Sequence, residues 1–275
     1  MELDRTRLLE PADLQSLTMA PDTDLLIVDV GAAERFARAH LPGAVLVTPP
    51  ELVSGIPPAS GRLPDADRLA ALAQRLALTP ETLVVAYDDE GGGWAGRLLW
   101  TLEILGHRNW KYLDGGIHAW HDAGLPLSET PGDRPEASAP PALELDLAPL
   151  AEGDDVAATI DGLGQIWDAR SFEEYVGSRV NAARGGHVPG ARHLDWLDLM
   201  DRNRALRLRE DVVDVIRGAG LDLDAPIITH CQSHHRSGLS WLVGRLLGLD
   251  IRAYHGSWGE WGNDAERPVR TGAEP

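Results

Sequence analysis

The feature that most constrains the fold is a duplication: four short motifs of the first half return, in the same order, in the second half. The offsets between partners are 139, 147, 143 and 141 residues. Four ordered matches at nearly one spacing indicate that one module is written twice. The pairs are LIVDV (26–30) with QIWDA (165–169), HLPGA (40–44) with HVPGA (187–191), TLVVAYD (82–88) with APIITHC (225–231), and LDGGIHAW (113–120) with YHGSWGEW (254–261).

Each copy alternates short apolar runs with longer amphipathic stretches. The apolar runs predict buried strands, at LLIVDV and LVVAYD in the first copy and QIWDA and PIITHC in the second. We expect helices over residues 65–78, 98–105, 211–219 and 237–247, the last one stopped by Gly248. Strands separated by helices predict an α/β fold of two tandem domains, each a mostly parallel sheet flanked by helices. Functional sites are then expected at the carboxyl ends of the strands.

The sequence between the two copies has the composition of a linker. Residues 130–141 read TPGDRPEASAPP, rich in proline and polar residues. We therefore expect a first domain over residues 1–130, a linker over 131–147 and a second domain over 148–275. Two domains also agree with the length of 275 residues.

The net charge and the cysteine content limit which binding partners and which cellular location are expected. The formal net charge is −18, and such an acidic surface argues against nucleic acid and anionic membrane as partners. The single cysteine, Cys231, allows no intrachain disulfide. No apolar run approaches the ~20 residues of a membrane span, and the first residues do not resemble a signal peptide. We expect a cytoplasmic protein, and a monomer because two domains of one chain already cover each other.

The one cysteine lies where a functional site is expected. In IITHCQSHHRSGL, residues 227–239, a strand runs into Cys231, a polar loop follows, and a helix begins near Ser237. Backbone N–H groups of such a loop and the helix dipole favour a thiolate, and they can hold an anion beside the sulfur. Arg236 adds a positive charge. A lone cysteine is often an inert core residue, but no core strand carries this polar flank.

Three kinds of chemistry compete for this loop. The first is sulfur transfer through a cysteine persulfide. The second is phosphoryl or arsenate chemistry, since Cys231 and Arg236 are similar to the ends of a cysteine-phosphatase loop; that loop needs five intervening residues, and four are present. The third is a metal site. Its ligands would be His230, Cys231, His234 and His235, which cannot readily close a tetrahedron without further ligands.

The chain as a whole resembles the tandem-domain rhodanese family of sulfurtransferases. The matching motifs are Asp168-Ala-Arg170, Gly186-His-Val-Pro-Gly190, the Cys231 loop and the run from Gly256 to Trp261. The resemblance implies that the second domain is catalytic and that the first is degenerate, with Asp88 at the position of the nucleophile. It also implies a persulfide on Cys231, no metal and no organic cofactor. The persulfide-binding loop would comprise Gln232, Ser233, His234, His235, Arg236 and Ser237.

Two departures concern the donor pocket and the loop shape. Mammalian-type enzymes carry a second arginine four residues after the Asp-x-Arg arginine, and here that position holds Glu174. We therefore expect other cations to bind the donor, and the candidates are Arg170, Arg184 and Arg179. Family loops usually have glycine at the position of His234.

His187 and His40 recur in the His-x-Pro-Gly turn of both copies and are interpreted as structural residues. Trp258 and Trp261 are interpreted as residues of the core or of the domain interface.

The predicted function is transfer of a sulfane sulfur from thiosulfate or 3-mercaptopyruvate to a thiol or cyanide acceptor, with ping-pong kinetics. The Arg236-Ser237 ending resembles thiosulfate-type bacterial members and favours thiosulfate as the donor. The alternative is a persulfide carrier without turnover, or a regulatory rhodanese-like binding module.

Overall fold

Each half of the chain builds a parallel sheet of five strands, and the two sheets share one strand order. The computed structural model describes residues 1–20, 23–141 and 144–275. The first sheet has the order β1-β5-β4-β2-β3 and the second the order β6-β12-β11-β7-β8. The strands of the first half are β1 Leu8–Leu9, β2 Leu25–Val30, β3 Val45–Val47, β4 Leu83–Tyr87 and β5 Trp110–Leu113. The second-half strands are β6 Leu150–Ala151, β7 Gln165–Asp168, β8 Arg192–His193, β11 Ile227–His230 and β12 Ile251–Tyr254.

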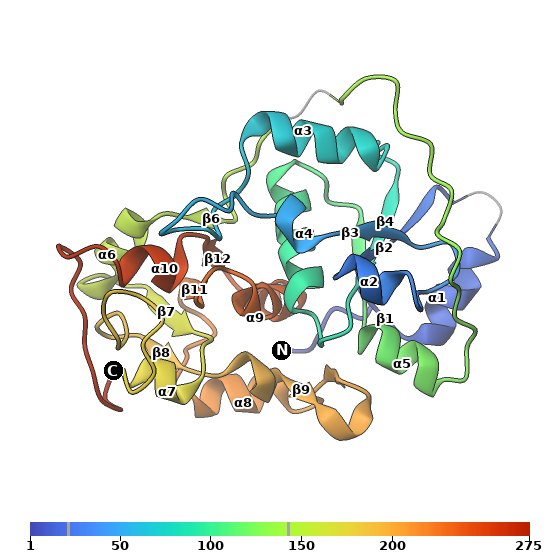
Figure 1. Ribbon diagram of the computed structural model, residues 1–275. Coiled ribbons are helices and arrows are strands. Elements are labelled where there is room, and N and C mark those ends of the chain that lie inside the picture. The colour runs from blue at the N-terminus through green and yellow to red at the C-terminus, as the bar shows by residue number, and fades with distance from the viewer. Residues whose placement is uncertain (21–22, 142–143) are drawn as a thin grey trace.

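The helices lie on both faces of the sheets, so the expected α/β architecture is confirmed (Figure 1). A short antiparallel pair, β9 Met200–Asp201 and β10 Arg207–Leu208, lies outside the two sheets. The first half contains α1 Pro11–Thr18, α2 Ala33–Phe36, α3 Ala66–Arg75, α4 Gly93–Ile104 and α5 Gly116–Asp122, with a 3-10 turn at Pro49–Glu51. The second half contains α6 Gly153–Ile160, α7 Phe172–Tyr175, α8 Val212–Gly218, α9 Arg236–Leu246 and α10 Ser257–Trp261, with 3-10 turns at Trp196–Leu199 and Arg202–Arg204.

One predicted helix begins earlier than its sequence suggested. The helix expected over residues 98–105 is α4, which starts at Gly93, the last residue of a glycine run that would ordinarily weaken a helix. Gly92 adopts a left-handed φ of 105°, and the Asp88 carboxylate accepts a hydrogen bond from the Ala95 N–H of the first turn. A carboxylate at this end satisfies free N–H groups and favours the helix.

The two halves meet along α4 and α9. Figure 1 shows these helices between the first half, blue to green, and the second half, yellow to red. At their crossing the backbones nearly touch: a Cβ on Gly96 would lie 2.3 Å from the Gly238 carbonyl oxygen, and one on Gly238 would lie 2.4 Å from that of Gly93. Only glycine permits so close an approach.

A single apolar core extends across this contact. The largest cluster of buried apolar residues contains side chains of both halves, among them Trp100 and Trp110 of the first and Leu239 and Trp241 of the second. The Trp110 and Trp241 rings lie 6.3 Å apart. Of two smaller clusters, one covers the outer face of the first sheet and the other covers the outer face of the second.

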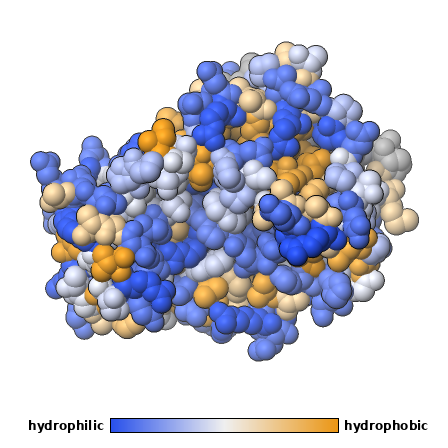
Figure 2. Space-filling model, viewed as in Figure 1, coloured by the Kyte–Doolittle hydropathy of each residue, from blue (hydrophilic) through white to orange (hydrophobic). Residues whose placement is uncertain are grey.

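Hydrophilic residues dominate the face of the molecule shown in Figure 2, in keeping with the net charge of −18. Within residues 1–20, 23–141 and 144–275, no helix has the length and apolar character needed to cross a lipid bilayer.

Candidate active site

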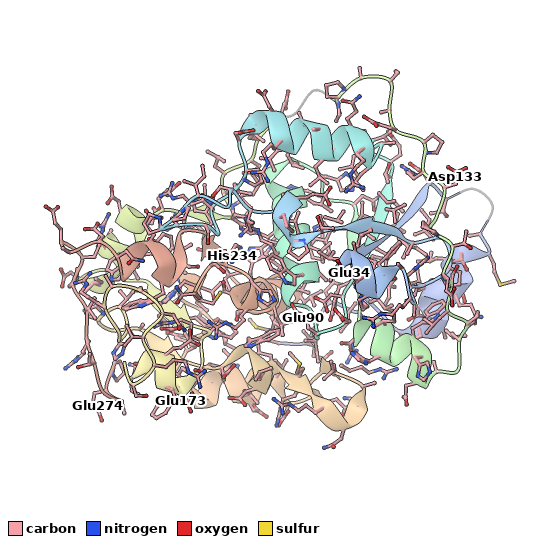
Figure 3. The ribbon with its side chains drawn as sticks, in the orientation of Figure 1. Glu34, Glu90, Asp133, Glu173, His234 and Glu274 are labelled. Carbon is pink, nitrogen blue, oxygen red and sulfur yellow. The ribbon has the colours of Figure 1, made fainter. Side chains whose placement is uncertain are left out.

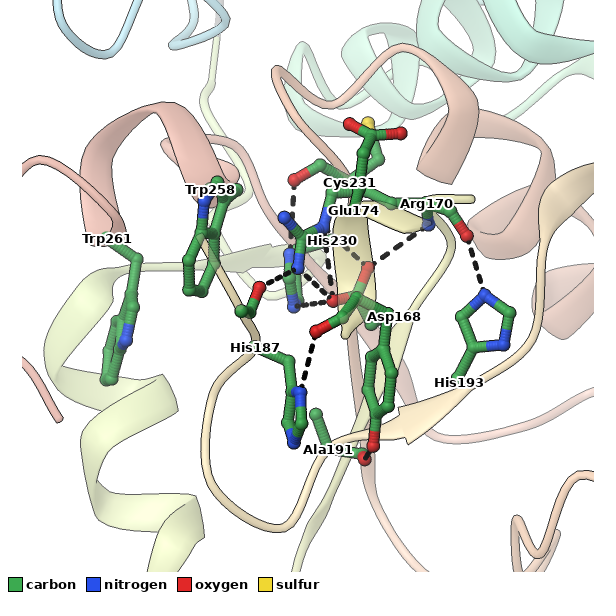
Figure 4. Close-up of polar contacts among 12 residues, drawn as sticks. Asp168, Arg170, Glu174, His187, Ala191, His193, His230, Cys231, Trp258 and Trp261 are labelled. Carbon is green, nitrogen blue, oxygen red and sulfur yellow. Dashed lines mark hydrogen bonds and ion pairs between the residues drawn. The ribbon is translucent and has the colours of Figure 1, made fainter. Parts of the chain in front are cut away.

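Cys231 follows the central strand β11 of the second sheet and lies at the start of the loop that leads into α9. Its side chain is buried, at 1% exposure. The Cys231 N–H donates to the Ser257 hydroxyl at 3.4 Å, and its carbonyl accepts from Trp258 N–H at 2.9 Å. These contacts join the loop to the start of α10. Figure 4 shows Cys231 above the polar residues at the ends of β7 and β11.

The surroundings of Cys231 favour the thiolate. Burial acts to raise the pKa of the thiol, but the charge of Arg236 and hydrogen bonds from Ser237 and Ser233 outweigh it, so that the pKa is lowered. A cation and backbone N–H groups at a helix start stabilise the anionic, nucleophilic form of the sulfur. The strand, loop and helix start that were predicted around Cys231 are thus present in the structure.

The lowered pKa predicts a pH-dependent contribution to stability. The unfolded thiol keeps its proton up to about pH 8.5, whereas the folded one loses it at lower pH. Between these two pKa values unfolding takes up a proton, so this contribution grows as pH rises and disappears as pH falls through the folded pKa. We expect the free energy of unfolding of the wild type, minus that of Cys231→Ser, to increase from pH 6 to pH 9 in urea titrations. A pH-independent difference would contradict the lowered pKa.

The side chain of Arg236, the first residue of α9, is engaged in an ion pair. Its guanidinium forms a two-pronged ion pair with Glu174 of α7, with N–O distances of 2.6 and 3.0 Å. Glu174 is buried; burial opposes its ionisation, but the hydrogen bond and charge of Arg236 lower its pKa to about 2. The carboxylate that stands where a donor-binding arginine was expected therefore neutralises part of the cation beside the cysteine.

Two of the three arginines predicted to bind the donor have other partners. Arg170 is buried, pairs with Asp168, donates to the Gly186 carbonyl at 2.7 Å and lies over the Trp258 ring (Figure 4). Arg184 donates to backbone carbonyls of the C-terminal segment at Trp261, Asp264 and Arg267. Arg179 is exposed. A donor-binding role requires Arg170 and Arg184 to release these contacts.

His234 takes the backbone conformation for which related loops use glycine. Its φ is +53°, in the left-handed region that side chains adopt rarely. The side chain is fully buried between the two halves (Figure 3), where its Nδ1 lies 2.8 Å from the Ser237 hydroxyl and its ring meets Trp100 edge-on. Burial lowers the pKa of His234 well below its usual range, so its imidazole is neutral. These contacts offset the strain of the backbone.

His235 connects the loop to the first half. Its imidazole stacks on Trp94 with ring centroids 4.4 Å apart, and its Nε2 contacts the Glu90 carboxylate. Both partners come from the loop and helix that are equivalent, in the first half, to the Cys231 loop and α9. Gln232, which donates to the Asn181 carbonyl at 3.1 Å, and Ser233, whose carbonyl lies close to Gly61, complete the predicted loop.

The equivalent loop of the first half is filled by its own side chain. The Asp88 Oδ1 accepts hydrogen bonds from the N–H groups of Glu90, Gly91 and Gly92 at 3.1, 3.0 and 2.8 Å. Its Oδ2 accepts from Ala95 at 2.9 Å. Asp88 thus places a carboxylate in a ring of backbone N–H groups, which leaves that ring closed to an external anion.

The two turn histidines make equivalent contacts in both halves. His40 bonds the Phe36 and Thr130 carbonyls, and His187 bonds those of Tyr175 and Glu274. Each ring also stacks on the nearby aromatic residue. Trp258 and Trp261 are buried in the core beneath the second sheet. These contacts agree with the structural interpretation of all four residues.

Sequence reasoning missed the first-half residues that reach the loop. Glu90 and Arg97 contact His235 and His234, and no spacing in the sequence relates them to Cys231. One signal was available: Arg97 is a charged residue in an otherwise apolar stretch of α4.

Comparison with known proteins decides the family. Residues 10–123 and 152–264 each match the family described as "Rhodanese-like domain". The chain belongs to the rhodanese family. A relative from Azotobacter vinelandii named thiosulfate sulfurtransferase is 45% identical over 95% of this chain and 96% of its own. One of the same name from Pseudomonas aeruginosa is 44% identical over the same shares.

More distant relatives share the architecture. A protein of Thermus thermophilus named as a sulfur carrier is 30% identical over 92% of this rhodanese chain and 90% of its own. Among solved structures, the anaerobic ergothioneine biosynthesis enzyme from Chlorobium limicola superposes with a TM-score of 0.86 at 21% identity. That match covers 97% of this chain and 70% of the other, and it confirms the fold.

Proposed function

We propose that this protein is a thiosulfate sulfurtransferase that carries sulfur as a persulfide on Cys231. The single observation that carries the proposal is the position of the only cysteine, at the end of β11 under the start of α9. The chain is also 45% identical, over nearly its whole length, to a protein named for this activity.

The reaction proceeds in two displacements at sulfur. The Cys231 thiolate attacks the outer sulfur of thiosulfate, the sulfur–sulfur bond of the donor breaks, and its electron pair leaves with sulfite. A nucleophilic acceptor such as cyanide or a thiol then attacks the outer sulfur of the persulfide and returns an electron pair to Cys231. N–H groups of the loop and the charge of Arg236 stabilise the anionic sulfur in both steps.

The test is the intact mass of the protein after brief incubation with thiosulfate, and separately with 3-mercaptopyruvate. Thiosulfate is expected to add one sulfur atom to the wild type, cyanide to remove it, and Cys231→Ala to gain none. No gain from either donor would overturn the proposal. A gain of sulfur only from 3-mercaptopyruvate would mean that this compound, and not thiosulfate, is the donor.

Glu174 is expected to weaken donor binding. The Glu174→Gln variant keeps the side-chain shape but removes the charge that neutralises Arg236, so that more of the arginine's field reaches the dianionic donor. We expect half-maximal sulfur loading at a ~5-fold lower thiosulfate concentration, equivalent to about 1 kcal/mol. The exposed neighbour Glu173, changed to Gln, is the matched control. A higher concentration for Glu174→Gln would instead mean that the ion pair holds Arg236 in its donor-binding position.

A persulfide carrier is the second candidate, favoured by the relative named as a sulfur carrier. Steady-state kinetics separate the two functions. An enzyme forms thiocyanate continuously from thiosulfate and cyanide with saturation by both, whereas a carrier accepts one sulfur from its partner and shows no such turnover.

For the organisation of the chain we propose a degenerate domain over residues 1–130, a linker over 131–147 and a catalytic domain over 148–275. We propose a monomer, because α4 and α9 already cover each other within one chain. The predicted donor-binding roles of Arg170, Arg179 and Arg184 belong to the same proposal, and Arg170 and Arg184 take them up only after they release their present partners.

A further inference from the structure

Arg97 is a fully buried arginine that reaches the catalytic loop from the first half. It lies on α4 with 0% exposure. Its Nη1 donates to the carbonyl oxygens of Gly61 and His234 at 2.8 and 3.3 Å, and its Nη2 donates to that of Leu52 at 2.6 Å. The guanidinium also lies over the Trp100 ring, 4.8 Å from its centre.

This guanidinium has no carboxylate partner among residues 1–20, 23–141 and 144–275. Every hydrogen bond it forms goes to a neutral carbonyl, and its Nε has no partner within the same residues. A buried cation without a counter-charge is costly, and proteins rarely retain one. Burial lowers the pKa of Arg97 to about 9, and the negative charge of Cys231 acts in the opposite direction.

We propose that Arg97 is a second counter-charge of the Cys231 thiolate, in addition to Arg236, supplied across the domain contact by the domain in which Asp88 stands at the nucleophile's position. The proposal rests on the proposed function, since it concerns the same sulfur. Arg97 is a positioning residue: it holds the loop through the His234 carbonyl and stabilises the anionic sulfur through its field.

Arg236 also favours the thiolate, but Glu174 neutralises part of its charge, and the other charged groups around the loop are paired or neutral. Arg236 of α9 is paired with Glu174 of α7, and Arg170 is paired with Asp168 at the end of β7. Burial lowers the pKa values of the remaining buried histidines near the loop, which are therefore neutral at pH 7. These histidines are His230 on β11, His234 in the loop and His255 after β12.

The further charged groups form pairs of their own at the domain contact. Glu90 contacts His235, and Arg62 pairs with Glu152 and Glu260. Arg97 thus differs from Arg62, Arg170 and Arg236, which pair with carboxylates, in having only carbonyl oxygens as hydrogen-bond acceptors.

The test measures the pKa of Cys231 from the pH dependence of alkylation by iodoacetamide, followed by intact mass. Because the chain has one cysteine, each added mass reports this sulfur alone. Arg97→Gln keeps amide donors for the carbonyls but removes the charge, and we expect the pKa of Cys231 to rise by about one unit, a ~10-fold change in the thiolate equilibrium. Arg97→Lys keeps the charge and is expected to leave the pKa close to that of the wild type.

The matched control is Arg245→Gln. Arg245 pairs with Glu103 and so also joins α9 to α4, but it lies nine residues along α9 from Arg236, ~13 Å along the axis. A purely structural role of Arg97 would lower the melting temperature of Arg97→Gln and leave the pKa of Cys231 unchanged, and that result overturns the inference. Alkylation needs no sulfur donor, so failure of the proposed function shows separately, as a wild type that gains no sulfur from thiosulfate or 3-mercaptopyruvate.

If Arg97→Gln does not fold, the charge is tested from the sulfur side in chains that also carry Arg236→Gln and Glu174→Gln, which remove both members of that ion pair. Cys231→Asp and Cys231→Asn differ only in charge at the site. With Arg97 as counter-charge, the Asp chain is expected to be at least as stable as the Asn chain at pH 8. An Asp chain that is ~10-fold less favoured in its folding equilibrium would overturn the inference.

Discussion

A chain with serine in place of Cys231 is expected to lose sulfur transfer by at least ~10⁴-fold in kcat/KM, the scale seen when a covalent nucleophile is removed. The serine hydroxyl stays protonated where the thiol ionises, and the sequence holds no second cysteine to take its place. The equivalent residue of the first half, Asp88, cannot carry sulfur. The measurement is thiocyanate formation from thiosulfate and cyanide, beside the intact mass of the incubated protein.

The control for this variant restores a thiol elsewhere. Met19 is 80% exposed and lies in the first half, so Met19→Cys in the Cys231→Ser chain adds an accessible thiol outside the loop. We expect that double variant to stay inactive, because the surface thiol lacks the N–H groups and cations that stabilise the anionic sulfur. Sulfur transfer by Cys231→Ser itself would contradict the assignment of the nucleophile.

Gly238→Ala is expected to destabilise the protein by ~3 kcal/mol, the upper part of the usual range for overpacking. The added Cβ would lie 2.4 Å from the Gly93 carbonyl oxygen and 2.7 Å from the Arg97 nitrogen, both backbone atoms of α4. Relief therefore requires the two helices to separate, which also draws Arg97 away from the catalytic loop. Urea unfolding measures the loss of stability.

Gly218→Ala is the matched control. Gly218 ends α8, and a Cβ there meets nothing within 4 Å. Alanine is the better helix former, so a gain of up to ~1 kcal/mol is expected. A Gly238→Ala chain as stable as the wild type would show that the helices separate at no cost, against the close backbone contact.

The sequence predicted the elements around the site well because they depend on local pattern. The apolar run ending at Cys231, the polar loop and the helix beginning at Arg236 are determined by neighbouring residues and by the repeat. The repeat also related Asp88 to Cys231, and its carboxylate lies in a similar ring of N–H groups. Gly248 has the left-handed φ of 73° expected of a helix stop.

The contacts between the halves could not be predicted in the same way. A duplication shows which residues are equivalent, but it does not show which of them touch. Arg97 reaches the His234 carbonyl, and Glu90 reaches His235, only because α4 and α9 cross at Gly96 and Gly238. That crossing depends on the surfaces of two helices separated by about 140 residues of sequence.

Sequence reasoning also could not predict which partners the charged side chains contact. Glu174 was singled out as a departure at a donor-binding position, but its effect became visible only in the ion pair with Arg236. The candidates Arg170 and Arg184 were named for their charge and position, but the carbonyl groups that they contact, Gly186 for Arg170 and Arg267 for Arg184, lie in other segments of the chain.

The core that runs from Trp100 and Trp110 into Trp241 has a consequence for the two halves as separate polypeptides. Either half expressed without the other would expose a large apolar face to water. The two halves therefore depend on each other for folding, whatever chemistry each of them carries.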